Sequence, residues 1–138
     1  MTAARRQTTT RPASAADARA YLDKALEFLR AAEDSLELGN RVAAAGNAVH
    51  AGIAAADAIT AARATVVWKG EHSQSPAHLE RVAGDDGRKA ATHLRRLLPL
   101  KNRAEYDPDP ILATEAKAAV TAAARMVRIA EQTVKQVE

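Results

Sequence analysis

The spacing of small apolar residues constrains the fold of this chain more than any other feature. From Leu112 almost to the C-terminus, apolar residues recur every three or four positions. This period matches one face of an α-helix, whereas a half-buried strand would alternate every two residues. The positions on this face are Leu112, Ala116, Val120, Ala123, Val127, Ala130, Val134 and Val137. The last part of the chain is therefore predicted to be one long amphipathic helix.

A second helical pattern begins near the N-terminus. Ser14 and Asp17 have the spacing of a capping box, in which a hydroxyl and a carboxylate satisfy backbone N–H groups of the first turn. The apolar stripe that follows ends at Gly39-Asn40, so this helix is predicted to end there. Asn40 is then the expected N-cap of the next helix.

That next helix is predicted to extend from about Arg41 to Trp68, with Gly70 as its stop signal. The β-branched run Thr65-Val66-Val67 is too short to predict a strand. A polar connector follows, and the helical pattern returns briefly at residues 77–83.

Turn-forming residues at 84–87 separate this short helix from a third long helix. Pro99 interrupts that helix, because proline lacks an N–H group and clashes with the preceding turn. The Asp-Pro repeat at 107–110 enforces a second break. Asp109 and Pro110 are the expected cap and first position of the final helix.

Four long amphipathic helices predict an all-α fold. The most economical arrangement is an up-and-down four-helix bundle, with a short extra helix between the second and third long helices. Aromatic residues make up only 3% of the chain, so small aliphatic side chains must fill the core, and each buries little area. We therefore expect a homodimer in which a second copy completes the burial.

The length and charge distribution suggest one domain preceded by an arm. The chain has 138 residues, no cysteine and a formal net charge of +3. Residues 1–16 carry three arginines and no acid, so we expect a basic, disordered arm at 1–16 and a helical domain at 17–138. No apolar leader or uninterrupted membrane-length apolar run is present, so we expect a cytoplasmic protein without membrane contact.

Polar and charged groups crowd together after Pro99. Lys101, Asn102, Arg103, Tyr106 and Asp107 are candidate ligand-binding or nucleic-acid-binding residues. Arg103 is also the candidate catalytic residue, since a guanidinium can clamp a phosphate; its alternative role is a salt bridge across the helices. Tyr106 either stacks on a base or is a packing anchor, and packing is the commoner role for a tyrosine beside an Asp-Pro break.

Two further candidates lie on the second long helix. His50 and Asp57 are seven residues apart and therefore share a helix face, where they can line one groove. The alternative for His50 is a structural histidine with satisfied hydrogen bonds. His72 and His78 match no recognised zinc-ligand spacing, so no metal and no other cofactor is predicted.

Three segments of the chain resemble HEPN domains (higher eukaryotes and prokaryotes nucleotide-binding). They are Asn47–Gly52 in the second helix, Lys69–His72 in the connector and Lys101–Asp107 before the last helix. The resemblance spans residues 17 to 137, and the chain looks most like the small stand-alone bacterial versions. It implies a four-helix bundle that dimerises, with the sites of both protomers meeting near the dimer axis.

Many HEPN proteins are metal-independent ribonucleases or toxins whose signature is an arginine followed, after four to six residues, by a histidine. After Arg103 these positions hold Pro108, Asp109 and Pro110, none of which can transfer a proton near neutral pH. The resemblance therefore implies a dimer that binds nucleic acid, a nucleotide or a partner protein, such as a cognate antitoxin, without cutting RNA.

Two alternatives stay open. One is an endoribonuclease of a toxin–antitoxin or defence system, with Arg103 as phosphate clamp and Asp107, His50 or His72 as a non-standard base. The other is a purely structural or regulatory helical dimer.

Overall fold

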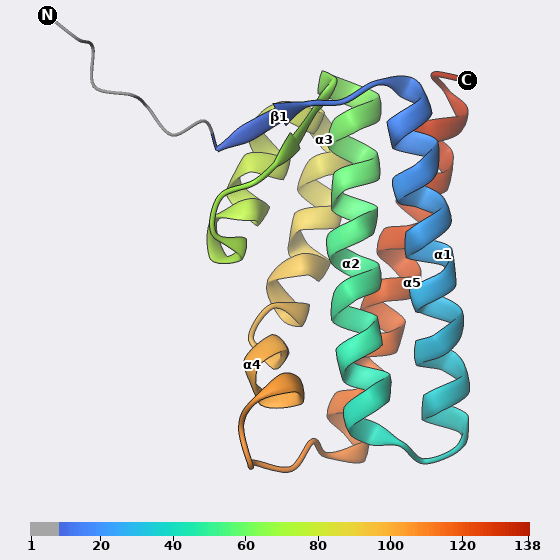
Figure 1. Ribbon diagram of the computed structural model, residues 1–138, viewed down its shortest axis with the longest axis vertical. Helices are drawn as coiled ribbons and strands as arrows, with labels where there is room; N and C mark the ends of the chain where they lie inside the picture. Colours follow the sequence, from blue (N-terminus) through green and yellow to red (C-terminus); the bar gives the residue numbers. More distant parts are fainter. Residues whose placement is uncertain (1–8) are drawn as a thin grey trace, which may run out of the picture.

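The computed structural model describes residues 9–138 and is mostly helical, which confirms the all-α prediction at this coarse level (Figure 1). A small antiparallel sheet is the exception among the described residues. The elements in chain order are β1 (Thr10–Pro12), α1 (Ala15–Glu37), α2 (Arg41–Ala64), β2 (Val66–Trp68), a 3-10 turn η1 (His72–Gln74), α3 (Ser75–Leu97), α4 (Leu100–Glu105) and α5 (Ala113–Lys135).

Helix α2 is the centre of the packing. It contacts α1, α3, α4, α5 and β2, while α1, α2 and α5 run side by side along the long axis (Figure 1). Its buried side chains are mainly alanines, so its neighbours approach closely. A Cβ atom on Gly52 would lie 2.5 Å from Leu97 Cδ1 and 3.3 Å from Met126 Sδ, so only glycine fits there without rearrangement.

By length and composition alone, α2 could also cross a membrane. Core helices of water-soluble proteins pass the same test, and 61% of its most apolar window is buried inside the fold. Its apolar character is therefore explained by its central position.

The first helix begins and ends where the sequence predicts. The Ser14 hydroxyl accepts a hydrogen bond from the Asp17 N–H at 3.0 Å, and the Asp17 carboxylate accepts one from the Ser14 N–H at 2.8 Å. Gly39 adopts a φ of +78°, a left-handed conformation that glycine accepts at low cost after a helix. Asn40 precedes α2, but its side chain makes no capping hydrogen bond, contrary to the prediction.

The end of the second helix differs from the prediction. Helix α2 stops at Ala64, because Thr65 takes a left-handed φ of 54°, and Val66–Trp68 then forms β2 instead of continuing the helix. This strand pairs antiparallel with Thr10–Pro12. The rejection of a strand at 65–67 was wrong, because its partner lies more than fifty residues away, beyond the reach of a local pattern.

The same pairing corrects the predicted disordered arm at 1–16. Thr10–Pro12 is a strand, and the Ala13 N–H donates to the Thr65 carbonyl at 2.8 Å, so this part of the arm is ordered. Arg5 and Arg6 lie outside the described residues.

The connector and third helix follow the sequence signals more closely. Gly84 has a non-helical φ of 61° and ψ of −142°, which kinks α3 between the predicted short helix and the third long helix. The short helix begins at Ser75 and is continuous with the third long helix except at this kink. Pro99 stops α3, and the chain restarts as α4, which places most of the predicted irregular junction in a short helix.

The final helix begins later than predicted. Asp109 and Pro110 lie in the non-helical segment between α4 and α5, and α5 starts at Ala113. Glu115 takes over the capping role, because its carboxylate accepts a hydrogen bond from the Leu112 N–H at 3.0 Å.

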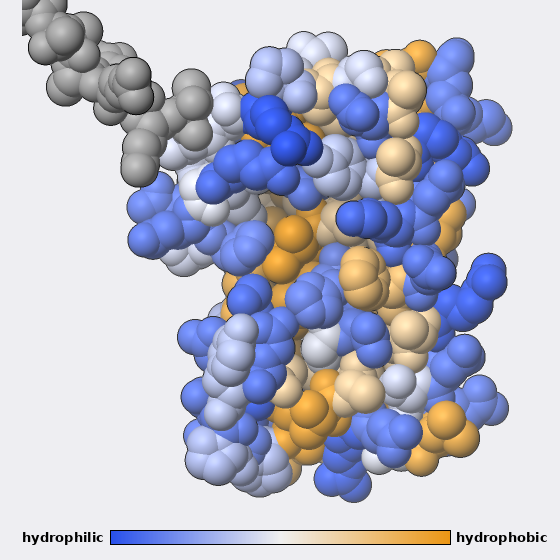
Figure 2. All heavy atoms as spheres, viewed as in Figure 1, coloured by the Kyte–Doolittle hydropathy of each residue, from blue (hydrophilic) through white to orange (hydrophobic). Residues whose placement is uncertain are grey.

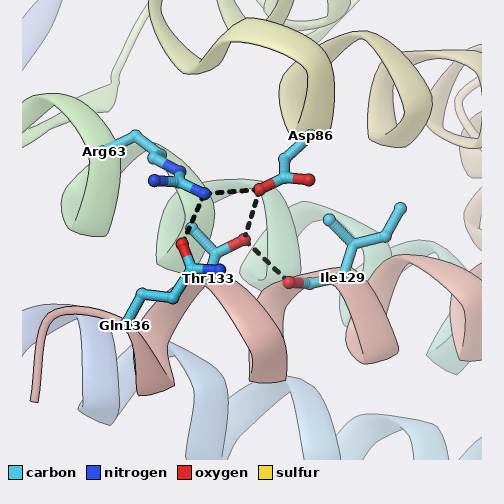
Figure 3. Close-up of polar contacts among 5 residues, drawn as sticks. All are labelled: Arg63, Asp86, Ile129, Thr133 and Gln136. Carbon is cyan, nitrogen blue, oxygen red and sulfur yellow. Dashed lines mark hydrogen bonds and ion pairs between the residues drawn. The ribbon is translucent and has the colours of Figure 1, made fainter.

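A polar network joins three helices near the C-terminus (Figure 3). Arg63 of α2 donates to the Asp86 carboxylate of α3 and to the Gln136 side chain after α5, each at 2.6 Å. The buried Thr133 hydroxyl lies between Asp86 Oδ2, at 3.5 Å, and the Ile129 carbonyl oxygen, at 2.8 Å. This network ties α2, α3 and α5 together.

Candidate ligand-binding groove

Helix α4 divides the polar cluster predicted after Pro99 into two sets with different partners. Arg103 contacts the start of α5, whereas Glu105 contacts α2 and pairs with Lys101. The sequence made Arg103, His50 and Asp57 candidates for one site, but Arg103 lines no cavity together with either of the other two.

The Arg103 guanidinium is held by protein groups. It donates to both carboxylate oxygens of Glu115, at 2.5 and 3.0 Å, and to the Pro110 carbonyl at 2.8 Å. The hydrogen bond from Arg103, followed by that from the Leu112 N–H, lowers the pKa of Glu115 to about 2. These contacts support the alternative role of Arg103, a salt bridge that joins α4 to α5.

On the side facing α2, Glu105 links two candidate residues. Its Oε1 lies 3.1 Å from His50 Nε2, and its Oε2 lies 3.3 Å from Lys101 Nζ. The His50 ring also packs against Phe28, with 5.3 Å between ring centroids. His50 is therefore positioned by both a carboxylate and an aromatic side chain.

His72 of η1 lies where two adjoining cavities meet. One, of about 330 Å³, lies between α2, the end of β2 and the start of α3; the other, of about 490 Å³, lies between the connector and α4. His72 lines both. We call the two cavities together the His72 groove. Figure 2 shows that this face is recessed between the connector and α4, with hydrophobic surface inside the recess.

The charges around His72 come from three separate parts of the chain. Burial lowers the pKa of His72, and the charge of Lys101 adds to this effect, with smaller contributions from His50 and Lys69. Glu105 opposes the shift. Since all four groups act electrostatically on one imidazole, the groove gathers side chains of α2, the connector and α4.

Asp57 lines the smaller cavity. Burial raises its pKa to about 6, against the opposing charges of Lys69, Arg11 and Lys24. Its carboxylate accepts no hydrogen bond from the residues that the structure describes. A partly desolvated acid without a donor is suited to a ligand that brings one.

His78 lines the same cavity and is only 3% exposed. Its Nε2 atom is buried and has no partner among the described residues, while its ring stacks on Trp68 with 4.9 Å between centroids. Burial lowers its pKa, which favours the neutral ring. The sequence drew attention to His78 only as a metal ligand, and among the described residues no three potential ligands converge on a metal position.

The remaining candidates differ in position. Asn102 lines the larger cavity with Lys101, whereas Tyr106 and Asp107 line neither. Tyr106 is 74% exposed, so its interpretation as a packing anchor was wrong; it is the C-cap residue of α4, where the chain leaves the helix. Lys69 and His78 line the smaller cavity but were not among the candidate binding residues, and His72 was considered only as a possible base or metal ligand. The polar character of the connector was the available signal for Lys69 and His72.

In comparisons with known proteins, the chain matches no family model and no curated protein.

Proposed function

We propose that this chain is a HEPN-like protein that binds a nucleotide or a segment of RNA in the His72 groove without cutting it. One observation carries the proposal. The three segments that resemble HEPN domains contribute His50, the pair Lys69 and His72, and the pair Lys101 and Asn102, and all of these lie at or beside one groove.

The chemistry of the groove suits such a ligand. Lys69 and Lys101 can neutralise phosphate charge, and the Asn102 amide can donate and accept hydrogen bonds. Ile53 and Trp68 give the smaller cavity an apolar wall for the flat face of a base. Asp57 can accept hydrogen bonds from the N–H groups of that base.

The absence of cleavage is supported by the residues of the expected catalytic motif. Arg103 is engaged by Glu115 and by the Pro110 carbonyl, and no histidine follows it at the required spacing. A phosphate would have to displace a carboxylate to reach this guanidinium.

The proposal includes an up-and-down four-helix bundle formed by α1, α2, α3 and α5, and a cytoplasmic homodimer. Exposed apolar side chains support the dimer: Leu38 and Val42 lie around the α1–α2 turn, and Leu112 lies before α5. Both connections lie at the same end of the molecule (Figure 1). Light scattering after size exclusion should give twice the chain mass at micromolar concentration, and a monomer would contradict the dimer.

Binding is tested with a fluorescently labelled RNA oligonucleotide and with labelled nucleotides, using anisotropy at low salt. Lys101→Ala should weaken binding by about five- to tenfold, the effect of one lost charged contact to phosphate. Arg30→Ala removes the same charge from an exposed position on α1, outside the groove, and should change binding less than about twofold. Equal effects of the two variants, or no affinity for either probe, would overturn the proposal.

One contact favours a second candidate, a ribonuclease. The His50–Glu105 pair, at 3.1 Å, has the geometry of a histidine oriented by a carboxylate, which is suited to general base catalysis. Incubation with total RNA separates the two functions. The binding protein leaves RNA intact, whereas the ribonuclease cuts it and loses that activity in His50→Ala.

A further inference from the structure

A second groove lies on the other side of α4 and is separate from the His72 groove. It has a volume of about 560 Å³ and lies between the end of α3, α4 and the first half of α5. The two grooves share one lining residue, Pro99, at the junction before α4. Arg95 lines the His72 groove, whereas the neighbouring Arg96 lines this second groove. We call it the α3–α5 groove.

The charged side chains that line the α3–α5 groove are mostly basic. Four basic side chains line it: Arg96, Arg103, Lys117 and Arg125. Glu115 is the single acid in the lining, and its carboxylate is already paired with Arg103. Within residues 9–138, the other three basic side chains form no ion pair. The groove therefore presents a net positive rim that a negatively charged partner would neutralise.

The floor of the groove is apolar and made of small or flat side chains. Pro99 and Leu100 form one wall, and Ala118, Ala119 and Ala122 of α5 form the base. A phosphate backbone would leave such a floor without a matching surface, whereas the apolar stripe of an amphipathic helix would cover it. Small residues also let a second backbone come close.

The length of the groove fits a helix. Its lining runs along α5 from Thr114 to Arg125, which is about 16 Å at a rise of about 1.5 Å per residue. This corresponds to about three turns of a docked helix. This chain's own α1 is acidic overall on its exposed face, but its only exposed apolar residues are Ala15, Ala16 and Ala20 near its start. It therefore lacks the long apolar stripe that would cover the floor of the groove.

We propose that the α3–α5 groove docks an acidic amphipathic α-helix of a partner protein. The apolar stripe of that helix covers Ala118 and Ala122, and its flanking carboxylates pair with Lys117, Arg125 and Arg96. This site is independent of nucleotide binding in the His72 groove, so either proposal can fail without the other.

The probe is a displayed library of helical peptides about sixteen residues long and unbiased in charge, selected against the full chain. The selected peptides should share apolar residues at three- and four-residue spacing flanked by Asp and Glu. Their affinity for the double variant Lys117→Glu, Arg125→Glu should fall by at least tenfold. Arg128→Glu, on an exposed position of the same helix outside the groove, should keep the affinity within about threefold.

A second variant tests the floor separately from the charges. Ala118 is exposed, so Ala118→Trp can fill the groove without disturbing the core, and it should abolish peptide binding while leaving RNA or nucleotide binding unchanged. The proposal is overturned if the selected peptides lack the acidic apolar pattern, or if Ala118→Trp leaves their affinity intact. It is also overturned if an RNA oligonucleotide competes for this groove in a way that depends on Arg125 but not on Ala118, since the site would then bind phosphates.

Discussion

Two polar clusters lie within two turns of each other on α2, and they differ in how their hydrogen bonds are satisfied. The cluster around Arg63 is closed, because Asp86, Gln136 and Thr133 all find partners within it (Figure 3). The cluster around Asp57 is open, because its carboxylate and the buried Nε2 of His78 find no partner among the described residues.

This difference distinguishes polar groups that stabilise the fold from polar groups that are available to a ligand. A closed network joins helices and gains its free energy within the fold, whereas an open cluster carries a desolvation cost that a ligand can relieve. Arg103 belongs to the closed kind, although the sequence made it the leading catalytic candidate. Removing a group from a closed cluster should therefore destabilise the fold, and neutralising a group in the open cluster should stabilise it.

The largest effect is expected at Asp86. Asp86→Ala leaves Arg63 without its carboxylate and removes an acceptor near the buried Thr133, which should lower the free energy of unfolding by about 2 to 3 kcal/mol for this partly exposed pair. Urea denaturation followed by circular dichroism measures this. Asp85→Ala is the matched control, since Asp85 is 80% exposed and pairs only with Arg88, and it should cost less than about 0.5 kcal/mol. Similar losses of unfolding free energy in both variants would show that the contacts of Asp86 stabilise the fold no more than those of an exposed acid.

Asp57→Asn should have the opposite sign. The folded pKa of Asp57, about 6, lies above its ordinary value of 3.8, so folding stability falls as the pH rises through this window. The amide removes the partly buried charge and should stabilise the protein by about 2 kcal/mol at pH 8, and the difference should vanish as the pH falls below 3.8. Thermal unfolding across this pH range measures the effect. Asp34→Asn, at an exposed position on α1, is the matched control. Parallel stability curves for Asp57→Asn and the wild type would contradict the desolvation of the Asp57 carboxyl.

A smaller effect is expected at Glu115, because its partly exposed carboxylate pairs with Arg103 but, unlike that of Asp86, accepts no hydrogen bond from a buried hydroxyl among the described residues. The folded pKa of Glu115, about 2, lies below its ordinary value of 4.5, so the pair stabilises the fold above pH 4.5 and loses this contribution as the pH falls toward 2. Glu115→Gln should therefore unfold at a lower temperature than the wild type at pH 7, and the gap should close on acidification. Glu131→Gln, an exposed change later in α5, is the control. If the difference in unfolding temperature between Glu115→Gln and the wild type does not change with pH, the destabilisation comes from lost helix capping and not from the ion pair.

The sequence predicted those features that depend on neighbours along the chain. Ser14 and Asp17 cap α1 as expected, and Pro99 ends α3, because capping geometry and proline sterics act within one turn. The strand at Val66–Trp68 was missed because its partner strand comes from the N-terminal segment. Its local signal was weak, and a long-range pairing decided the outcome.

The sequence also predicted only part of the candidate site, because several of its contacts join residues that are far apart in the chain. His50 was named from its helix face, and Lys101 and Asn102 from the polar cluster after Pro99. All three lie at or beside one groove. The pairing of Arg103 with Glu115, twelve residues later, depends on how α4 meets α5, and the cavity at Asp57 depends on three elements at once. Neither the ion pair nor the cavity can be recognised from the spacing of residues in the sequence.

The smallest effect on stability is expected at Tyr106. Its substitution tests whether the ring is exposed to solvent or packed against other side chains. Its ring is 74% exposed, with Lys101 Nζ 6.0 Å from the ring centroid, so Tyr106→Ala should change the free energy of unfolding by less than about 0.5 kcal/mol. Phe28→Ala is the contrast, because that ring packs against the core and against His50, and its loss should cost several times more. A cost at Tyr106 above about 1 kcal/mol would mean that the ring is buried in solution, and the dimer interface would then be the surface that covers it. Repeating the measurement at several protein concentrations decides this, since burial between two copies makes the unfolding midpoint depend on concentration and burial within one chain does not.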